Sequence, residues 1–325
     1  MANVSAAGTL WNLPNLDGML FTPSQVNTTF VNSISRSMIV QSPEYAMSSN
    51  YLLESAAQPA ITETASLTAP TPTSYVRDNE KNVAQIYQEK ISLSYAKLSA
   101  NNRLRYTEVS TSGYAYSTEP GQNAIDDEIA FQLRANLEQI RVNFEYTALN
   151  GTYQLATSAA VAFKTRGIIT GSTTNTVDAS SAQLSKAIVD QLLVEMAGNG
   201  AFDLPGRKVI FANAYQVKQL NDIYGYAPQD RMEGGTAVNT IYTPFGVFDV
   251  IYNPRVPADT ILVCNLDALA VVFQPVPGKS TVENNVVFEQ LAKTGAGEDW
   301  QLYVQLGIDY GSSYYHGTIT SLATS

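Results

Sequence analysis

The longest regular pattern of apolar and polar positions lies in the stretch NAIDDEIAFQLRANLEQIRVNFEYTALNG. Its apolar residues recur every three or four positions, at Ile129, Leu133, Leu137, Ile140, Phe144 and Ala148. This spacing predicts one amphipathic helix over 123–149, with a single buried stripe. Acidic residues in its first turn favour the helix dipole, and Gly151 can end the helix in the left-handed conformation. Such a helix would be about 40 Å long, well above the usual length in globular proteins.

A second helical pattern occurs in SSAQLSKAIVDQLLVEMAGNG, between a serine and a glycine that are typical helix boundaries. Its apolar face consists of Leu184, Ile188, Leu192 and Met196. Further along, KVIFA, TIYTPFGVFDVIYNP and TILVC predict strands, NAYQVKQLNDIYG predicts a short helix, and LDALAVVFQPV is another apolar run. Helices and strands are mixed without regular alternation and without an internal repeat, which predicts an α+β fold.

Two stretches alternate with the period of a strand. VAQIYQEKISLSYA, residues 83–96, is the first, and WQLYVQLGIDYG is the second, with Trp300, Leu302, Val304, Leu306 and Ile308 on a face that should be buried. Before the first stretch, residues 59–75 alternate Thr and Ser with apolar residues and contain prolines, which disfavour a central strand but are tolerated at an edge. Together, 59–96 predict a long two-stranded excursion, which would be marginal in water without a neighbour to lie on.

The N-terminal region has weak periodicity up to about residue 58, with many Ser and Asn residues and scattered Met and aromatic residues. This composition predicts an arm that lies over another surface. It does not predict a self-contained core.

Composition points to burial against partners. Of 325 residues, 45% are hydrophobic and only 15% are charged, and 19 are tyrosines. A soluble monomer normally carries about a quarter charged residues, and interfaces are enriched in tyrosine and depleted in lysine. The alternative is a bacterial protein of ordinary polarity. The net charge of −10 argues against a nucleic-acid-binding surface, and Arg103 and Arg105 are expected to pair with acidic residues.

Single cysteine and histidine residues restrict the possible chemistry. Cys264 cannot form an internal disulfide, and its apolar neighbours predict a buried, inert thiol. The only base that could activate it is His316, and one Cys with one His cannot build a metal cluster, although carboxylate metal sites stay possible. The sequence shows no targeting signal and no membrane-spanning run, so folding in a cytoplasm is expected.

The stretch LAKTGAGEDWQLYVQLGIDYGSSYYHG, residues 291–317, holds the remaining candidates for chemistry. A phosphate-binding loop needs Gly-Lys-Ser/Thr opening a helix, whereas here Lys293 and Thr294 precede the glycines and a strand pattern follows. Asp309 and His316 would be about 23 Å apart on an extended strand unless a turn at 311–313 brings them closer. No G-x-S-x-G motif occurs. We therefore predict no catalytic, cofactor-binding or metal-binding residue, although a carboxylate pair from separate parts of the fold stays open.

Several stretches, in order along most of the chain, resemble the major capsid proteins of tailed bacteriophages with the Hong Kong 97-type fold. They are LPNLDGMLF, NVAQIYQEKISLS, EYTALNG, KTRGIIT, TPFGVFDVIYNPRVPADTILVCNLDALAVVF and the closing stretch quoted above. The resemblance implies an N-terminal arm over 1–55, an extended hairpin called the E-loop over 56–96, and a peripheral domain over 97–177 with 123–149 as its spine helix. It further implies an axial domain over 178–285 and closing strands of the peripheral domain over 286–325.

The function implied by the resemblance is structural. Copies of the chain would assemble as hexamers and pentamers into an icosahedral head shell that encloses double-stranded DNA in the virion, after assembly in the host bacterial cytoplasm. Scaffolding, portal and decoration proteins are partners that the resemblance allows, and no membrane or cofactor is implied. Some proteins of this fold form a Lys–Asn cross-link. Lys81 and Lys90 lie near the E-loop region, but no motif identifies an Asn partner, so no cross-link is predicted. The alternatives are an encapsulin-like compartment shell and an enzyme with a carboxylate site.

Overall fold

The computed structural model describes residues 26–50, 56–75, 77–95, 107–110, 113–116, 128–224, 240–279, 286–293 and 295–324. Predictions for most of the N-terminal arm, for Arg103 and Arg105, and for the first turn of the long helix at 123–127 lie outside the described residues. The chain divides into two compact units. The first unit comprises Met1–Asn27, Ile86–Phe144 and Pro275–Gln305, and the second comprises Thr28–Gln85, Glu145–Gln274 and Leu306–Ser325.

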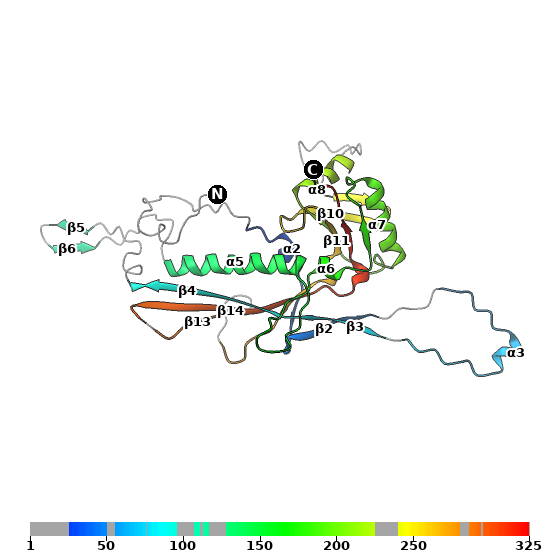
Figure 1. The fold of residues 1–325 in the computed structure, drawn as a ribbon, viewed down its shortest axis with the longest axis horizontal. Coiled ribbons are helices and arrows are strands. Elements are labelled where there is room, and N and C mark those ends of the chain that lie inside the picture. The colour runs from blue at the N-terminus through cyan, green and yellow to red at the C-terminus, as the bar shows by residue number, and fades with distance from the viewer. Residues whose placement is uncertain are drawn as a thin grey trace. The chain divides into compact units, whose positions relative to one another are not determined.

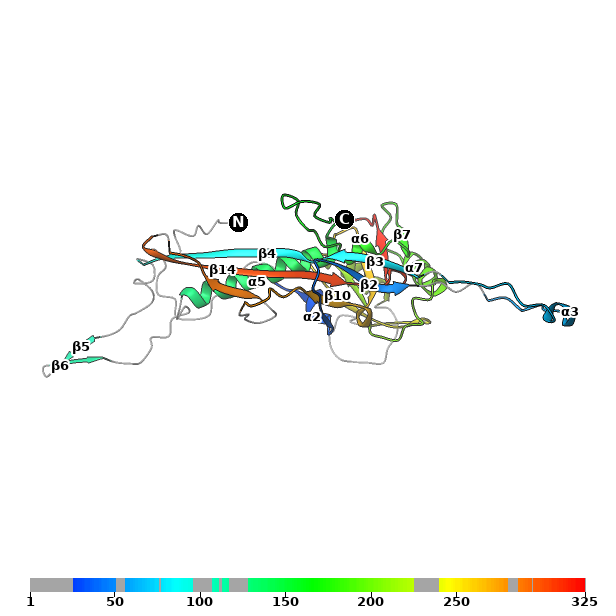
Figure 2. The ribbon, with the colours of Figure 1, turned by 90° about the horizontal axis from the view of Figure 1, so that it is seen from below.

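The first unit is a sheet covered by a helix. Strand β14 (Gly297–Asp309) pairs with β13 (Val287–Gln290) and with β4 (Gln85–Ser94). Figures 1 and 2 show that α5 (Glu128–Asn150) runs along one face of β4 and β14. A separate antiparallel pair is formed by β5 (Thr107–Ser110) and β6 (Gly113–Tyr116). The last residues of α5 and of β14 belong to the second unit.

The predicted long helix is confirmed from residue 128 onward. Its apolar stripe is increasingly buried toward the C-terminal end, where Ile140, Phe144 and Ala148 have almost no exposed surface. The ring of Phe144 meets that of Tyr87 on β4 edge-on, with centroids 6.1 Å apart. Of the face predicted for β14, Leu302, Val304, Leu306 and Ile308 are at most 8% exposed, whereas Trp300 is only partly buried. Both predicted stripes are thus largely buried.

The second unit is built on a six-stranded sheet in the order β7-β15-β11-β8-β10-β9. The strands are β7 (Thr176–Asp178), β8 (Lys208–Ala212), β9 (Thr240–Thr243), β10 (Gly246–Tyr252), β11 (Ile261–Asn265) and β15 (Gly317–Thr320). Parallel and antiparallel pairs are mixed: β10 is parallel to β8, and β11 is antiparallel to β8. The short η1 (Leu266–Ala268) follows β11. The predicted strands KVIFA, TILVC and the pair within TIYTPFGVFDVIYNP are confirmed, as is the α+β mixture.

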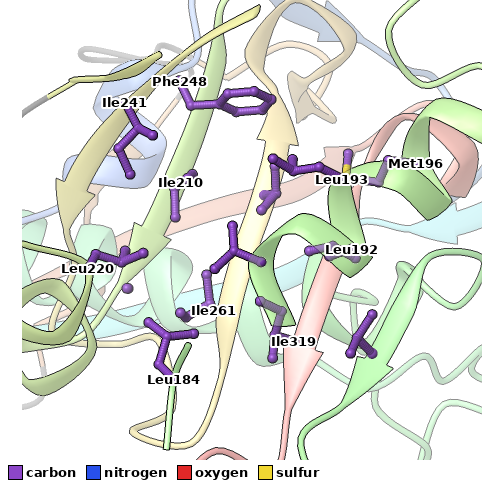
Figure 3. Close-up of a cluster of buried hydrophobic side chains, with 14 of the residues drawn as sticks. Leu184, Leu192, Leu193, Met196, Ile210, Leu220, Ile241, Phe248, Ile261 and Ile319 are labelled. Carbon is purple, nitrogen blue, oxygen red and sulfur yellow. The ribbon is translucent and has the colours of Figure 1, made fainter. Parts of the chain in front are cut away.

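Two helices bury their apolar faces on this sheet. Helix α7 (Lys186–Gly198) contacts β7 and β15, and α8 (Ala214–Tyr224) contacts β8 and β10. Figure 3 shows the resulting core, where Leu192 and Met196 of α7 face strands carrying Ile210, Ile261 and Ile319. Each such fully buried aliphatic side chain stabilises the fold by about 1.5–3 kcal/mol. The predicted short helix is confirmed as α8. Of the face predicted for the other helix, Leu192 and Met196 are buried on α7, Ile188 packs against the same core, and Leu184 is buried but precedes the helix.

A smaller group of strands extends the sheet of β14 within the second unit. The end of β14 pairs with β12 (Ala270–Phe273), and β12 pairs in parallel with β1 (Ser37–Ile39). The short helices α2 (Thr29–Ser33) and α6 (Ile168–Gly171), and η3 (Ser313–Tyr315), also belong to this unit. Parallel pairing of β1 with a strand more than 200 residues away is a long-range arrangement that periodicity does not reveal.

The predicted two-stranded excursion over 59–96 is wrong in its pairing. The hairpin consists of β2 (Glu44–Asn50) and β3 (Asp78–Val83), and between them the described residues 56–75 carry α3 (Glu63–Ser66) and no strand. Figures 1 and 2 show α3 at the far end of this hairpin. Residues 83–96 do contain a strand, β4, but it pairs with β14. Alternation identifies the buried face of a strand but not its neighbour, and the prolines of 59–75 leave that segment without a strand.

Candidate assembly surface

The phosphate-loop candidate leads into a strand. β14 begins at Gly297, so no helix N-terminus follows Lys293 and the glycines. Lys293 Nζ lies 3.3 Å from Tyr95 Oη and 3.4 Å from Glu298 Oε1. Both hydrogen bonds raise the pKa of Lys293, and the bond to Tyr95 has the larger effect. The lysine is therefore part of a surface contact beside the turn.

Asp309 and His316 stabilise a turn separately. β14 ends at Asp309, whose Oδ1 accepts the N–H of Gly311 at 2.7 Å, and Gly311 adopts a φ of +65°. Nε2–H of His316 donates to the backbone oxygen of Tyr310 at 2.6 Å. His316 has no exposed surface, and its burial lowers its pKa to about 4, whereas burial raises the pKa of Asp309. Both side chains close the same turn on backbone groups, so the structure does not bring them together as a catalytic pair.

The lone thiol is equally inert. Cys264 lies on β11 with 1% of its surface exposed, and burial raises its pKa well above the usual range. Among the described residues, no group of three or more His, Cys, Asp and Glu side chains is placed to hold a metal ion. None of the described helices combines the length and apolarity needed to cross a membrane.

A buried carboxylate that periodicity did not identify lies near the end of α5. Glu145 is fully buried; its Oε1 accepts the N–H of Phe30 at 2.9 Å and its Oε2 accepts the N–H of Val31 at 2.8 Å. Asn253 Nδ2 donates to Oε1 at 2.5 Å. Burial raises the pKa of Glu145, and these donors and Arg255 oppose the rise. The carboxylate thereby holds α2 to the end of α5 within the second unit. The ring of Phe30 also meets that of Phe211 edge-on, with centroids 5.3 Å apart.

The hairpin apex, residues 56–75, is the most exposed described part of the chain. Every residue in it is exposed, including the apolar side chains of Ile61 at 74%, Leu67 at 84% and Tyr75 at 54%. A second exposed apolar pair lies on the β9–β10 edge, where Tyr242 stands opposite Val247 in the ladder. Apolar side chains presented in this way are typical of surfaces that contact other proteins.

Ion pairs on the described surface involve the lysines considered for a cross-link. Lys81 Nζ lies 3.2 Å from Glu44 Oε1 across the hairpin, and Lys90 Nζ lies 2.9 Å from Asp299 Oδ2 between β4 and β14. The other pairs are Arg207–Asp249, Lys279–Glu289 and Lys293–Glu298. In each pair the cation is about half exposed, which is typical of surface pairs of small energy.

Comparison with known proteins identifies the fold. Among solved structures, the capsid asymmetric unit of cyanophage A-1(L) is similar, with a TM-score of 0.64, 12% identity and 100% of both chains covered. The holo-SrpI encapsulin complex from Synechococcus elongatus PCC 7942 is similar with a TM-score of 0.56 and 11% identity, covering 98% of this chain and 95% of that one. The capsid of the native GTA particle has a TM-score of 0.59 and 10% identity, with 98% of each chain covered. At these identities the likeness concerns the fold alone.

Sequence comparison identifies the family. No curated protein sequence matches the chain. A family model described as SU10 major capsid protein matches residues 3–323, almost the whole chain. The chain therefore belongs to the SU10 major capsid protein family: it is a structural, shell-forming component of the virion with the Hong Kong 97-type fold, and not an enzyme.

Proposed function

We propose that copies of this chain form hexamers and pentamers that close into the icosahedral head shell around double-stranded DNA. In this proposal the hairpin apex is the outer part of the E-loop, α5 is the spine helix of the peripheral domain, and the six-stranded sheet forms the core of the axial domain. Residues 97–177 and 286–325 supply the rest of the peripheral domain. Assembly takes place in the host cytoplasm, with scaffolding, portal and decoration proteins as further partners.

The exposed apolar hairpin apex carries this proposal. Ile61, Leu67 and Tyr75 are stabilised little by their own subunit, because each is more than half exposed. An isolated two-stranded hairpin is marginal in stability. A neighbouring copy that covers the apex would bury these side chains, and the same contact would repeat at every symmetry-related position.

The experiment replaces Ile61, Leu67 and Tyr75 by serine and follows assembly by sedimentation velocity and electron microscopy. We expect the wild-type chain, alone or with a co-expressed scaffold, to form capsomers or closed shells, and the triple variant to remain a folded subunit. The matched control replaces Thr64, Thr71 and Thr73 by serine, in the same exposed segment, and should assemble normally. A wild-type chain that stays monomeric under every condition, or a triple variant that assembles like the control, would contradict the proposal.

An encapsulin-like compartment is the second candidate, because the encapsulin complex shares the fold over nearly the whole chain. The two functions differ in cargo: a phage head packages DNA and an encapsulin encloses protein. Particles purified from infected or lysogenic cells should therefore release nuclease-protected DNA, and particles that release only a protein cargo would favour the compartment.

A further inference from the structure

The base of the hairpin is held by a fully buried amide. Asn82 on β3 has no exposed surface. Its Nδ2 donates to the backbone oxygens of Arg166 at 3.0 Å and Ile308 at 2.9 Å. Its Oδ1 accepts the N–H groups of Val83 at 2.9 Å and Arg166 at 2.8 Å. Both donors and both acceptor positions of the side chain are thus used, and no other residue type has this set of groups at this length.

Both strands of the hairpin are tied to the same place. Tyr45 stands opposite Asn82 in the β2–β3 ladder, and its hydroxyl donates to the same Ile308 oxygen at 2.9 Å. A Cβ on Gly307 would lie 2.5 Å from Tyr45 Oη, so only glycine leaves room for this contact. Next to the amide, Thr165 Oγ1 donates to the backbone oxygen of Val83 at 2.7 Å. The segments 165–166 and 307–308 therefore hold both strands of the hairpin, β2 through Tyr45 and β3 through Asn82 and Val83.

The apex has no comparable support. Within 56–75, the hydrogen bonds join residues of that segment to one another around α3, such as Ala65 N–H to Thr62 Oγ1. Among the described residues of this hairpin, the hydrogen bonds that tie it to the rest of the second unit are therefore those at its base. The chain between Asn82 and α3 can reach at most ~58 Å when fully extended, so a 10° change at the base moves the apex by up to ~10 Å. A displacement of that size would remove a contact with a neighbouring copy.

We propose that Asn82 is a positioning residue that sets the direction in which the hairpin leaves the subunit, and thereby where its apex meets a second copy of this chain. The second half of this statement rests on the proposed function. The first half concerns the isolated subunit and can be measured without assembly.

The test substitution is Asn82→Asp, which keeps the shape of the side chain but replaces the donating amide by a carboxylate oxygen facing two carbonyl oxygens. The matched control is Asn79→Asp, which makes the same change at an exposed position of the same strand. Spin labels on Ser66→Cys at the apex and Lys218→Cys on α8 report their separation by pulsed electron paramagnetic resonance, since the native Cys264 is buried. Hydrogen exchange at residues 41–50 and 77–84 reports how firmly the base is held.

We expect Asn82→Asp to broaden the distance distribution, to speed exchange at the base at least tenfold, and to abolish closed shells, while Asn79→Asp resembles the wild type. A residue that merely stabilised the fold would lower the melting temperature and leave the distance distribution of folded subunits unchanged. An unchanged distribution, or equal broadening in the control, would overturn the proposal. If Asn82→Asp does not fold, the same distance distribution is measured in Tyr45→Phe. This variant removes one hydrogen bond at the base and keeps the ring, and an unchanged distribution would again overturn the proposal.

Failure of the two proposals can be told apart. A wild-type chain that never assembles contradicts the proposed function, and the distance measurement on its subunits still decides the role of Asn82. Normal shells from an Asn82→Asp chain with a broadened distribution would show that hairpin direction does not control assembly, which overturns the second half of this inference alone.

Discussion

Oε1 of Glu145 accepts the backbone N–H of Phe30 at 2.9 Å, although the two residues are 115 positions apart. The carboxylate has no exposed surface and accepts a second backbone N–H from Val31. α2 has only five residues and no side-chain cap of its own. Its free N–H groups are therefore satisfied by a side chain from another part of the second unit.

Replacing Glu145 by glutamine should destabilise this connection. The amide keeps one acceptor oxygen, but its NH2 group would face a backbone N–H or the Asn253 amide, and each buried donor left unsatisfied costs about 1–3 kcal/mol. We expect a lower unfolding midpoint in urea and faster hydrogen exchange at Phe30 and Val31. Glu138→Gln, on an exposed position of α5, is the control. Equal unfolding midpoints for the two variants would show that the buried carboxylate contributes nothing specific.

His316 should make the folded chain sensitive to mild acid. Its folded-state pKa is about 4, because burial disfavours the charged ring, while an unfolded histidine titrates near 6.5. As the pH falls below ~6.5, the unfolded chain binds a proton that the folded chain does not, so stability is complete above that pH and is lost progressively toward pH 4. The full shift corresponds to about 3 kcal/mol at this one site.

The single histidine allows a direct measurement. Its imidazole resonance in a nuclear magnetic resonance titration should change near pH 4 in the folded subunit and near 6.5 in urea. In His316→Gln, the loss of unfolding free energy between pH 7 and pH 5 should be smaller than in the wild type by about 2 kcal/mol. A folded-state titration near 6.5 would show that the ring is accessible to water.

Phe144→Ala should cost about 3–5 kcal/mol, because it leaves a cavity beneath α5 and removes the edge-on contact with Tyr87. Thermal unfolding followed by circular dichroism should show a large fall in the melting temperature. Glu138→Ala on the exposed side of the same helix should change it little. Similar melting temperatures for both variants would mean that the stripe predicted from spacing is not a core face.

Cys264 should be unreactive until the second unit unfolds. The thiol is buried on β11, and its raised pKa leaves almost no thiolate at neutral pH. Reaction with Ellman's reagent should be slow in buffer and rapid in concentrated urea, with a midpoint that follows the loss of circular dichroism. Rapid labelling of the native chain would place the thiol at the surface.

Features with a local cause were predicted correctly from the sequence. Apolar spacing identified the stripe that ends at Phe144 and Ala148, and alternation identified the buried face of β14, because each pattern follows from one element exposing one side to the core. The turn that the sequence left open at 311–313 is present, with Gly311 at a φ of +65°. No pattern, however, shows which strand lies next to another, and for this reason the strand in 83–96 was paired with 59–75, whereas β4 lies beside β14.

The polar residues that hold the subunit together were not visible in advance. Glu145 follows Phe144 on a helix rich in charged residues, and its donors come from residues 30, 31 and 253. Asn82 lies in a strand of almost entirely polar sequence, and its partners lie at 166 and 308. Such networks depend on long-range geometry that is complete only after the chain has folded. The only local sign for Glu145 was its place directly beside the buried stripe.

The exposure of the ion pairs has a consequence for handling the protein. The cations of the five described pairs are 48–59% exposed, so each pair contributes little to the fold. The Debye length falls from about 8 Å at physiological ionic strength to about 3 Å in 1 M salt, which screens surface charges but leaves apolar burial in place. Concentrated salt should therefore leave the subunit folded. Any dissociation of particles that it causes would report on charges between copies, separately from the stability of the chain itself.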